Sequence, residues 1–202
     1  IEVVVATHPD SDHIGGLPAL FRNYQVESLL TNGQKGDTEV SALLYEIVRS
    51  RNVQMSEVAL GSEVLLSSRA KIQFLYPLLP LPPESQIETN EGSLVARLDF
   101  FETSFLFTGD LPREELALSS IEPVDILKVA HHGSRFSTRG TFLDVLRPKE
   151  AVVSVGENTY GHPHPSILEN LRQRNIATYR TDEQGDIVYQ CDRVSRRCTR
   201  ED

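Results

Sequence analysis

The stretch that most clearly suggests chemistry is THPDSDHIGGL, from Thr7 to Leu17. It brings two imidazoles and two carboxylates within six residues, namely His8, Asp10, Asp12 and His13. The apolar run IEVVVA precedes the stretch and is typical of a strand, so these side chains follow a strand end. Imidazoles and carboxylates gathered in this way are the ligands that divalent cations bind. The glycines at positions 15 and 16 allow a tight turn into a following helix.

Two later strand ends carry the same residue types. Asp110 follows the apolar run 105–107, and His131 and His132 follow the run 126–130. Loops at the ends of neighbouring strands meet at one edge of a sheet, where binding sites commonly lie. Any one of these residues alone is more often a turn residue, a cap or a structural histidine. As a set, they predict a site for divalent metal ions.

Other polar residues near these strand ends can be interpreted either as functional or as structural residues. His162 and His164, in YGHPHP, precede a helix that begins near Pro165 and could meet an anionic substrate at the start of that helix. The alternative is a rigid, proline-bounded loop with exposed imidazoles. Four further residues are lesser candidates for contacts with substrate or with metal ligands, namely Asn90, Ser93, Lys128 and Ser134. Lys128 lies in an alternating strand, where it could equally face solvent.

Helices and strands alternate along the chain. The apolar pattern predicts helices over residues 17–24, 38–51, 138–146 and 165–174, and a further helix could begin at Pro112. It predicts strands over residues 3–6, 26–30, 63–66, 71–76, 124–130, 151–155 and 187–190, and a hairpin over 93–99 and 104–108. The Pro-rich segment 78–92 is expected to be a loop on the surface or over a site. This order indicates a layered α/β or α+β domain with helices packed against sheets.

Composition narrows the class of protein. The chain has 202 residues, 39% hydrophobic and 24% charged, as in a soluble domain large enough to bury a core. No apolar run approaches the roughly 20 residues that span a bilayer. The net charge of −9 argues against capture of nucleic acid by electrostatics alone, although bound cations would supply positive charge at the site. Cys191 and Cys198 could form a disulfide across a terminal hairpin, and two free thiols are an equal alternative.

Taken together, the motifs resemble the metallo-β-lactamase fold, whose hallmark is HxHxDH after a strand, then a bridging Asp and a further His. Here the motifs read HPDSDH, FTGD and KVAHHGS. Five longer stretches are similar, in this order, to the C-terminal hydrolase domain of the ComEC family of competence DNA-uptake proteins: THPDSDHIGGL, FLFTGD, DILKVAHHGS, VGENTYGHPHPSIL and RTDEQGDI. The resemblance extends from Val3 to Ile187.

The resemblance implies an αββα sandwich formed by residues 1–202 as one hydrolase domain. In the family, further strands with a glycine-rich turn precede the HxHxDH strand. The resemblance therefore implies that the first strands of one sheet are missing, and that the chain is an N-terminally truncated fragment of a larger membrane protein.

Carried over to this sequence, the resemblance also implies roles for single residues. His8 and Asp10 would hold one divalent ion, and Asp12 and His13 a second. Asp110 would bridge the two ions, and His132 would complete the second site. Asp12 and His131 are the expected catalytic residues, with His131 contacting phosphate or protonating a leaving group. Which of His131 and His132 takes which part stays open.

Two departures from the family pattern bear on the identity of the metal. Asp10 stands where the family has a second His, and the neighbourhood of Asn90 lacks the family's further His. Oxygen ligands in place of nitrogen favour Mn²⁺ or Mg²⁺ over Zn²⁺. The expected cofactor is therefore a pair of divalent ions, with Mn²⁺ favoured and Zn²⁺ or Mg²⁺ as alternatives.

The resemblance implies a metal-dependent nuclease acting on single-stranded DNA during uptake. Its place would be the extracytoplasmic face of the bacterial cell membrane, beside the membrane channel and OB-fold portions of a parent protein, although this fragment alone would be soluble. One alternative is a free-standing hydrolase of a small phosphodiester or another ester, favoured by the acidic charge and by the lack of an evident aromatic stacking platform. The other is a degenerate assembly module without activity, for which Asp10 and the missing ligand before Ser93 are the support.

Overall fold

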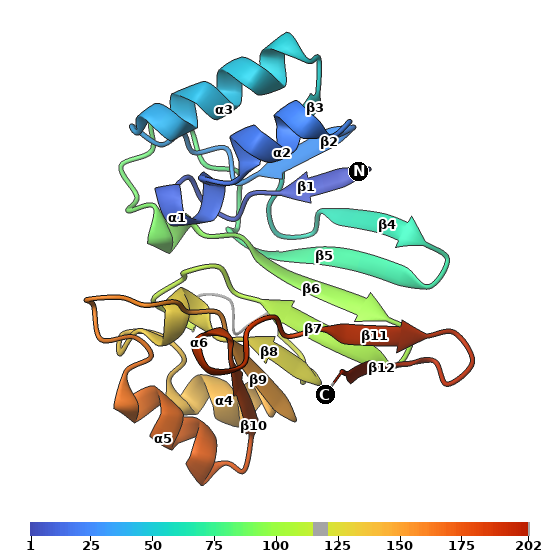
Figure 1. Ribbon diagram of the computed structural model, residues 1–202, viewed down its shortest axis with the longest axis vertical. Helices are drawn as coiled ribbons and strands as arrows, with labels where there is room; N and C mark the ends of the chain where they lie inside the picture. The colour runs from blue at the N-terminus through green and yellow to red at the C-terminus, as the bar shows by residue number, and fades with distance from the viewer. Residues whose placement is uncertain (115–120, 202) are drawn as a thin grey trace.

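Apolar segments of this chain form two main β-sheets that pack against each other, with helices on the outer side of each of them (Figure 1). The structure is a computed structural model that describes residues 1–114 and 121–201. Its helix, sheet, sheet and helix layers form the αββα sandwich that the family resemblance implies, within the α/β (α+β) class that the sequence pattern predicts.

The smaller sheet is parallel, because a helical segment returns the chain between its strands. The strand order is β1-β2-β3, with β1 (Val3–Val5), β2 (Ser28–Thr31) and β3 (Gln54–Glu57). Its helices are α1 (Ser11–Ile14), α2 (Leu17–Asn23) and α3 (Glu39–Ser50). Phe21, Leu29 and Leu44 are buried in the core between this sheet and the helices. Thr38 begins α3, where its hydroxyl accepts a hydrogen bond from the Ser41 amide at 3.3 Å.

The larger sheet has seven strands in the order β10-β9-β8-β7-β6-β5-β4. Its antiparallel part is β4 (Glu63–Ser67), β5 (Ala70–Tyr76), β6 (Val95–Phe100) and β7 (Thr103–Phe107), and its parallel part adds β8 (Ile126–Lys128), β9 (Glu150–Val153) and β10 (Ala177–Arg180). Helices α4 (Gly140–Leu146) and α5 (Pro165–Gln173) cover its outer face (Figure 1). Leu106, Leu127, Phe142 and Leu171 lie in the core that these elements share.

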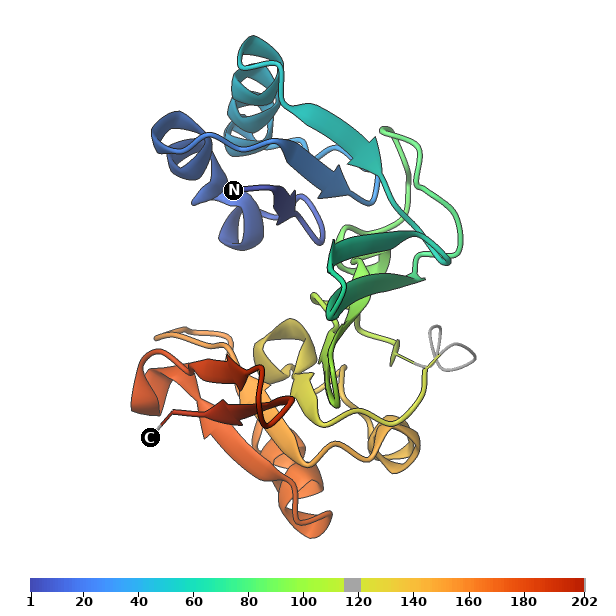
Figure 2. The same ribbon diagram turned by 90° about the vertical axis from the view of Figure 1, so that its right-hand side faces the viewer.

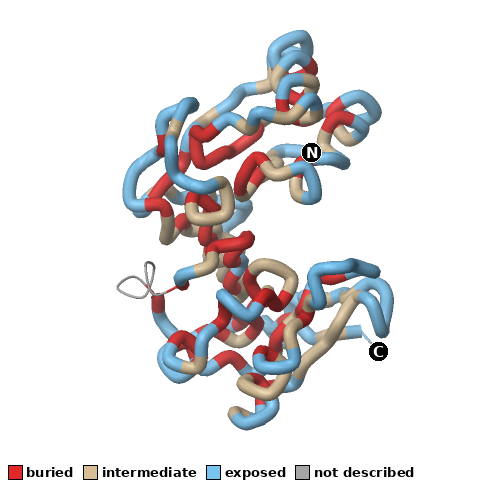
Figure 3. Tube along the Cα trace, turned by 90° about the vertical axis from the view of Figure 1, so that its left-hand side faces the viewer, coloured by how far each residue is buried: buried red, intermediate tan, exposed pale blue. Residues whose placement is uncertain are grey.

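A third apolar core lies between the two sheets and fixes them relative to each other (Figure 3). Leu30 of the smaller sheet lies in this core with Phe74 and Leu94 from the region of the larger sheet. The Leu94 amide also donates a hydrogen bond to the carbonyl of Thr7 at 2.8 Å. The loop that follows β1 is therefore held directly beside the segment that enters β6.

The chain ends in a two-stranded hairpin, β11 (Tyr189–Asp192) and β12 (Arg197–Arg200), which follows the short helix α6 (Thr181–Gln184) (Figure 2). Cys191 and Cys198 face each other in this hairpin and form a disulfide. The hairpin is tied to the larger sheet by the Cys198 amide, which donates to Thr103 Oγ1 at 2.9 Å, and by the Tyr189 hydroxyl, which donates to Glu150 Oε2 at 2.7 Å.

The predicted elements agree with the structure apart from a few differences at their ends. The strand predicted over 124–130 ends at Lys128, because the chain turns into a short 3₁₀ segment, η4 (Ala130–Gly133). The sequence pattern did not predict β3 or β10, which are short and largely polar. A helix beginning at Pro112 would enter residues 115–120, which lie outside the described residues. Within the described ranges, no helix has the length and apolar character needed to cross a bilayer.

Candidate metal centre

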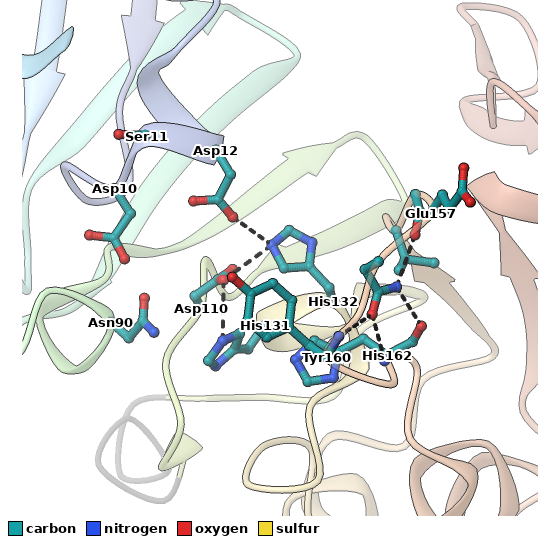
Figure 4. A pocket seen from close by; sticks show the side chains of 13 residues that line it. Asp10, Ser11, Asp12, Asn90, Asp110, His131, His132, Glu157, Tyr160 and His162 are labelled. Carbon is teal, nitrogen blue, oxygen red and sulfur yellow. Dashed lines mark hydrogen bonds and ion pairs between the residues drawn. The ribbon is translucent and has the colours of Figure 1, made fainter.

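Four side chains from distant parts of the chain converge where the two sheets meet. Asp12 and His13 lie on α1, Asp110 follows β7, and His132 lies in η4. One ligand atom from each of the four residues lies within 4.8 Å of every other. Figure 4 shows Asp12 reaching this point from one side, with His132 and Asp110 on the other. The sheet packing described above is what brings the N-terminal helix to the strand ends of the larger sheet.

The buried carboxylate of Asp110 is the centre of this group. Its Oδ1 lies 3.1 Å from Nε2 of His13, and its Oδ2 lies 3.3 Å from Nε2 of His132. Nε2 of His132 also lies 3.2 Å from Oδ2 of Asp12. Nε2 of His13 is buried, and among the described residues its contact with Asp110 lacks the geometry of a hydrogen bond. A buried imidazole nitrogen in that state, facing carboxylate oxygens, fits a divalent cation bound among them.

The two adjacent histidines have different surroundings. Nδ1 of His132 lies 2.7 Å from the carbonyl oxygen of Ser154, so this nitrogen carries the proton and donates. Its Nε2 therefore faces Asp12 and Asp110, and once its proton is lost this nitrogen offers a lone pair to a cation, as in metal sites where a backbone carbonyl orients a histidine ligand. Nε2 of His131 lies 4.0 Å from Oδ2 of Asp110, at the edge of the group. This geometry favours His132 as the ligand and leaves His131 facing the pocket.

The turn that carries these histidines is conformationally unusual. His131, His132 and Gly133 all have positive φ, at 49°, 52° and 81°. Such a conformation costs non-glycine residues about 1–2 kcal/mol each, and it is characteristic of functional sites. A Cβ on Gly133 would lie 2.6 Å from Cβ of Pro163, so glycine is needed here for space as well as for conformation.

Asp110 is held in place by a buried residue, Ser93, and by a partly buried one, Lys128. Its backbone amide donates to Oγ of Ser93 at 3.0 Å, and Ser93 is fully buried. Nζ of Lys128 donates to the carbonyl of Gly109 at 2.9 Å and lies 3.5 Å from Oδ1 of Asp110. Lys128 therefore points inward and supports Asp110. Alternation along its strand could not show this, because the direction in which its long side chain bends depends on the tertiary structure.

His8 and Asp10 lie beside the four-residue group and are not part of it. His8 is buried, its Nδ1 lies 3.0 Å from Oγ1 of Thr7, and its Nε2 lies 3.7 Å from Oδ2 of Asp10. The rings of His8 and His13 are 4.1 Å apart between centroids. The structure thus brings together the residues expected for the second ion. It places the two residues expected for the first ion next to them, in contact with each other.

Charge and burial together set the protonation of the site. Burial and the neighbouring His13 lower the pKa of His8 to about 3, so its ring is neutral and free to bind a cation near pH 7. Burial alone would raise the pKa of Asp110, but the adjacent rings of His13 and His132 and the charge of Lys128 outweigh it and hold that pKa below the usual value. Hydrogen bonding to Asp110 raises the pKa of His132, whereas burial lowers that of His131.

An open pocket of about 580 Å³ adjoins this centre. Seven of the expected site residues line it: Asp10, Asp12, Asn90, Asp110, His131, His132 and His162. The ring of His162 lies 5.6 Å from that of His131. The carbonyl-type oxygen of Asn90 is buried without a hydrogen-bond partner among the described residues, as expected of a group awaiting a ligand.

Three of the expected substrate contacts are not in the lining of this pocket. Ser93 lies beneath Asp110, as described above. Ser134 is buried in the turn after the histidines, where its Oγ faces the Phe136 amide at 3.5 Å. His164 begins α5, where its Nδ1 accepts a hydrogen bond from the Ser166 amide at 3.2 Å. The ring of His164 is therefore occupied as a helix cap.

One wall of the pocket comes from residues that sequence reasoning did not single out. Val155, Gly156, Glu157, Asn158 and Tyr160 form a loop between β9 and α5. The stretch GENTYGHPHP contains the signal for this loop, since glycine, asparagine and proline together indicate a structured turn. The sequence predicted roles for the histidines of this stretch, because imidazoles are common ligands and proton donors, but it predicted no role for the tyrosine.

Comparison with known proteins supports the resemblance seen in the motifs. The chain is 34% identical over 195 residues to ComE operon protein 3 of Bacillus subtilis, covering 94% of this chain and 24% of that protein. It is 27% identical to Recombination protein 2 of Haemophilus influenzae and 28% identical to Competence protein ComA of Neisseria gonorrhoeae, over 93% and 94% of this chain. The chain spans about a quarter of the length of these relatives. It covers 22% of the Haemophilus protein and 25% of the Neisseria protein. No protein-family model matches the chain.

Solved structures agree on the fold. A metallo hydrolase from Ignicoccus hospitalis, Igni18, matches with a TM-score of 0.52 and 14% identity, over 90% of this chain and 76% of that one. Zinc-bound PqqB from Methylobacterium extorquens matches with a TM-score of 0.56 and 14% identity, over 89% and 71%. The metallo-β-lactamase fold protein YhfI from Bacillus subtilis matches with a TM-score of 0.52 and 13% identity, over 90% and 75%. The chain is thus a domain of the metallo-β-lactamase fold that resembles ComEC-type competence proteins.

Proposed function

We propose that this domain is a metal-dependent phosphodiesterase that cleaves single-stranded DNA during uptake. The observation that carries the proposal is the convergence of Asp12, His13, Asp110 and His132 within 4.8 Å beside an open pocket. The competence and recombination proteins that the chain resembles support a role with DNA. Asp10 in place of the family's second histidine favours Mn²⁺, with Mg²⁺ or Zn²⁺ as alternatives.

The residues would divide between two ions according to their position. Asp12, His13, Asp110 and His132 would hold one divalent ion, and His8 and Asp10 would hold a second ion beside it. Bound divalent ions would lower the pKa of a water molecule and stabilise negative charge on phosphate oxygens. Lys128, fixed beside Asp110, would balance part of the negative charge that three carboxylates bring to the site.

Two residues on the pocket side are assigned proton transfer. The carboxylate of Asp12 is 63% exposed, so its Oδ2 would orient the attacking water and accept its proton. His131 lines the same pocket at the edge of the ligand group and would donate a proton from its ring to the departing 3′ or 5′ oxygen. Asn90, with its buried oxygen facing no partner in the described chain, would contact substrate or its bound cation.

The setting of the reaction is also part of the proposal. The chain matches only a quarter of its relatives' length, so the membrane channel and OB-fold portions would belong to the remainder of a parent protein. Those portions would supply the basic DNA-binding surface that a domain with a net charge of −9 lacks. The Cys191–Cys198 disulfide supports an oxidising compartment, and so a place on the extracytoplasmic face of the bacterial cell membrane.

The test is release of nucleotides from end-labelled single-stranded DNA in Mn²⁺, with Asp12→Asn as the inactive variant. We expect the substitution to lower the rate at least about 10³-fold, because it removes a proton acceptor and a ligand charge together. It should leave the melting temperature nearly unchanged, since this side chain is 63% exposed. Asp37→Asn is the matched control, an exposed acid outside the pocket lining. Equal activity in all three proteins would refute the proposal.

The acidic charge favours a second candidate, a hydrolase of small phosphodiesters. Turnover of bis-p-nitrophenyl phosphate without cleavage of DNA would select it. A third candidate, an assembly module without activity, would show less than one bound cation per chain in metal analysis of the purified protein.

A further inference from the structure

The pocket wall formed by the loop between β9 and α5 differs in chemistry from the metal centre. Among the residues that line the pocket and that the structure describes, none is a lysine or an arginine, and the loop wall itself carries Glu157. This wall is therefore poorly suited to hold phosphate by charge. What it does offer is flat ring surface, from Tyr160 and His162.

The loop that carries these rings is held rigidly by one asparagine. Nδ2 of Asn158 donates to the carbonyls of Gly156 and His162, both at 2.9 Å. Its Oδ1 accepts from the amides of Tyr160 at 3.1 Å and His162 at 3.0 Å. Two donors and two acceptor sites are all that an asparagine amide has. The loop is thus fixed without the help of the Tyr160 ring.

Tyr160 presents an exposed ring that a ligand in the pocket can reach. It is 83% exposed although it lines the pocket, so its ring adds little to the stability of the fold. One side of the ring packs on His162 at 6.0 Å between centroids, with only 25° between the two planes. The His162 ring in turn meets His131 edge-on at 5.6 Å (Figure 4). A continuous row of rings therefore leads from the pocket rim to the metal centre.

We propose that Tyr160 is a base-stacking residue that selects substrates with a nucleobase next to the scissile phosphodiester. The proposal rests on the phosphodiesterase function and names its substrate class as a single-stranded nucleotide chain. A fixed, exposed aromatic ring stacks on any nucleobase whatever its sequence, which suits an enzyme that degrades DNA of every sequence. The metal centre would then hold the phosphate while Tyr160 holds the adjoining base. An acidic domain would thereby gain affinity for DNA without a basic surface.

The test compares binding of two fluorescein-labelled oligomers by anisotropy. One is oligo-dT, and the other has the same length and phosphates but abasic sugars throughout. Binding is measured in Ca²⁺ in the cold, with a gel to verify that the oligomers stay intact. We expect the wild type to bind oligo-dT about tenfold more tightly than the abasic oligomer. Tyr160→Ala should lose this preference and keep its affinity for the abasic oligomer, and Tyr160→Phe should keep the preference.

Tyr24→Ala is the matched control, since Tyr24 is also largely exposed, at 58%, and lies outside the pocket lining. The proposal is overturned if the wild type binds both oligomers equally, if it binds neither, or if Tyr160→Ala keeps the preference for bases. Cleavage by the wild type in Mn²⁺ separates this result from the function itself. Equal cleavage of both oligomers would refute the stacking role alone. Base-selective binding without cleavage would refute the nuclease function alone.

Discussion

At the scale of single residues, the central feature is that the two adjacent histidines have different hydrogen-bond partners. The carbonyl of Ser154 fixes the protonated nitrogen of His132 and turns its other nitrogen to Asp110. His131 has no such partner on its Nδ1 among the described residues and faces the pocket. The sequence HHGS cannot distinguish them, because the distinction depends on a carbonyl more than twenty residues away.

This difference leads to opposite kinetic signatures for the two alanine variants. His132→Ala should raise the Kd for Mn²⁺ by about 100-fold, because it removes a ligand that is already oriented. His131→Ala should leave that Kd within about threefold and lower kcat by about 100-fold, because it removes a proton donor to the leaving group. Calorimetric titration with Mn²⁺ and steady-state cleavage measure the two effects. The reverse pattern would exchange the two assignments.

At the scale of elements, the site depends on turns that place side chains at the ends of strands. The turn after β8 keeps its left-handed conformation because Gly133 fits closely against Pro163. Gly133→Ala should therefore lower the free energy of unfolding by about 2–3 kcal/mol, combining conformational cost with a steric clash. Gly61→Ala is a matched control, since Gly61 also has positive φ, at 87°, but has open space around it.

Urea unfolding of the two glycine variants separates these contributions. Gly61→Ala should show only the conformational cost, about 1 kcal/mol. An equal loss of stability in both variants would mean that the contact with Pro163 does not constrain the histidine turn.

A second element-scale feature is Asp125, which joins three strands of the larger sheet. Its carboxylate accepts hydrogen bonds from the amide and hydroxyl of Ser104 at 2.9 and 3.0 Å and from Lys149 at 2.6 Å. Burial alone would raise the pKa of Asp125, but the hydrogen bonds from Lys149 and Ser104 outweigh it and hold that pKa below its ordinary value. Asp125→Asn should cost about 2 kcal/mol of unfolding free energy near neutral pH.

The pH dependence of this loss has a definite sign. A depressed pKa in the folded state means that the unfolded chain binds the proton more readily. The stabilisation by Asp125 is therefore complete above the unfolded pKa of about 3.9 and is lost as the pH falls through the lower folded value. The difference in unfolding free energy between wild type and Asp125→Asn should be constant from about pH 5 to 8 and shrink below about pH 4.

Asp144→Asn, which breaks an exposed pair with Arg174, is the control and should change the unfolding free energy by less than about 1 kcal/mol. A difference that grows in acid would contradict the assignment.

At the scale of the whole molecule, the sequence was sufficient for the class of the fold. Alternating helical and strand patterns predicted a layered α/β domain, and the family resemblance implied the αββα sandwich. Motifs at strand ends predicted that Asp12, Asp110 and one of the two adjacent histidines would lie close together. Contacts that depend on distant backbone were not predictable. Examples are the inward bend of Lys128 and the burial of Ser93 under Asp110. The stacking surface of Tyr160 was missed for a related reason, since its exposure depends on how Asn158 folds the loop.

The position of the site explains why the domain needs both of its sheets. Asp12 and His132 are 120 positions apart in sequence, and the apolar core between the sheets brings them together. No part of the chain confined to one sheet contains the whole group. Metal binding should therefore report on the integrity of the entire sandwich.

The most direct test is the anomalous diffraction signal of a crystal of this domain grown with Mn²⁺. We predict a peak within coordinating distance of Asp12, His13, Asp110 and His132, at the point where their ligand atoms converge within 4.8 Å. A second peak beside His8 and Asp10 would complete the pair of ions. A crystal that shows Mn²⁺ elsewhere, or with the carboxylate of Asp110 turned away from any ion, would contradict the account.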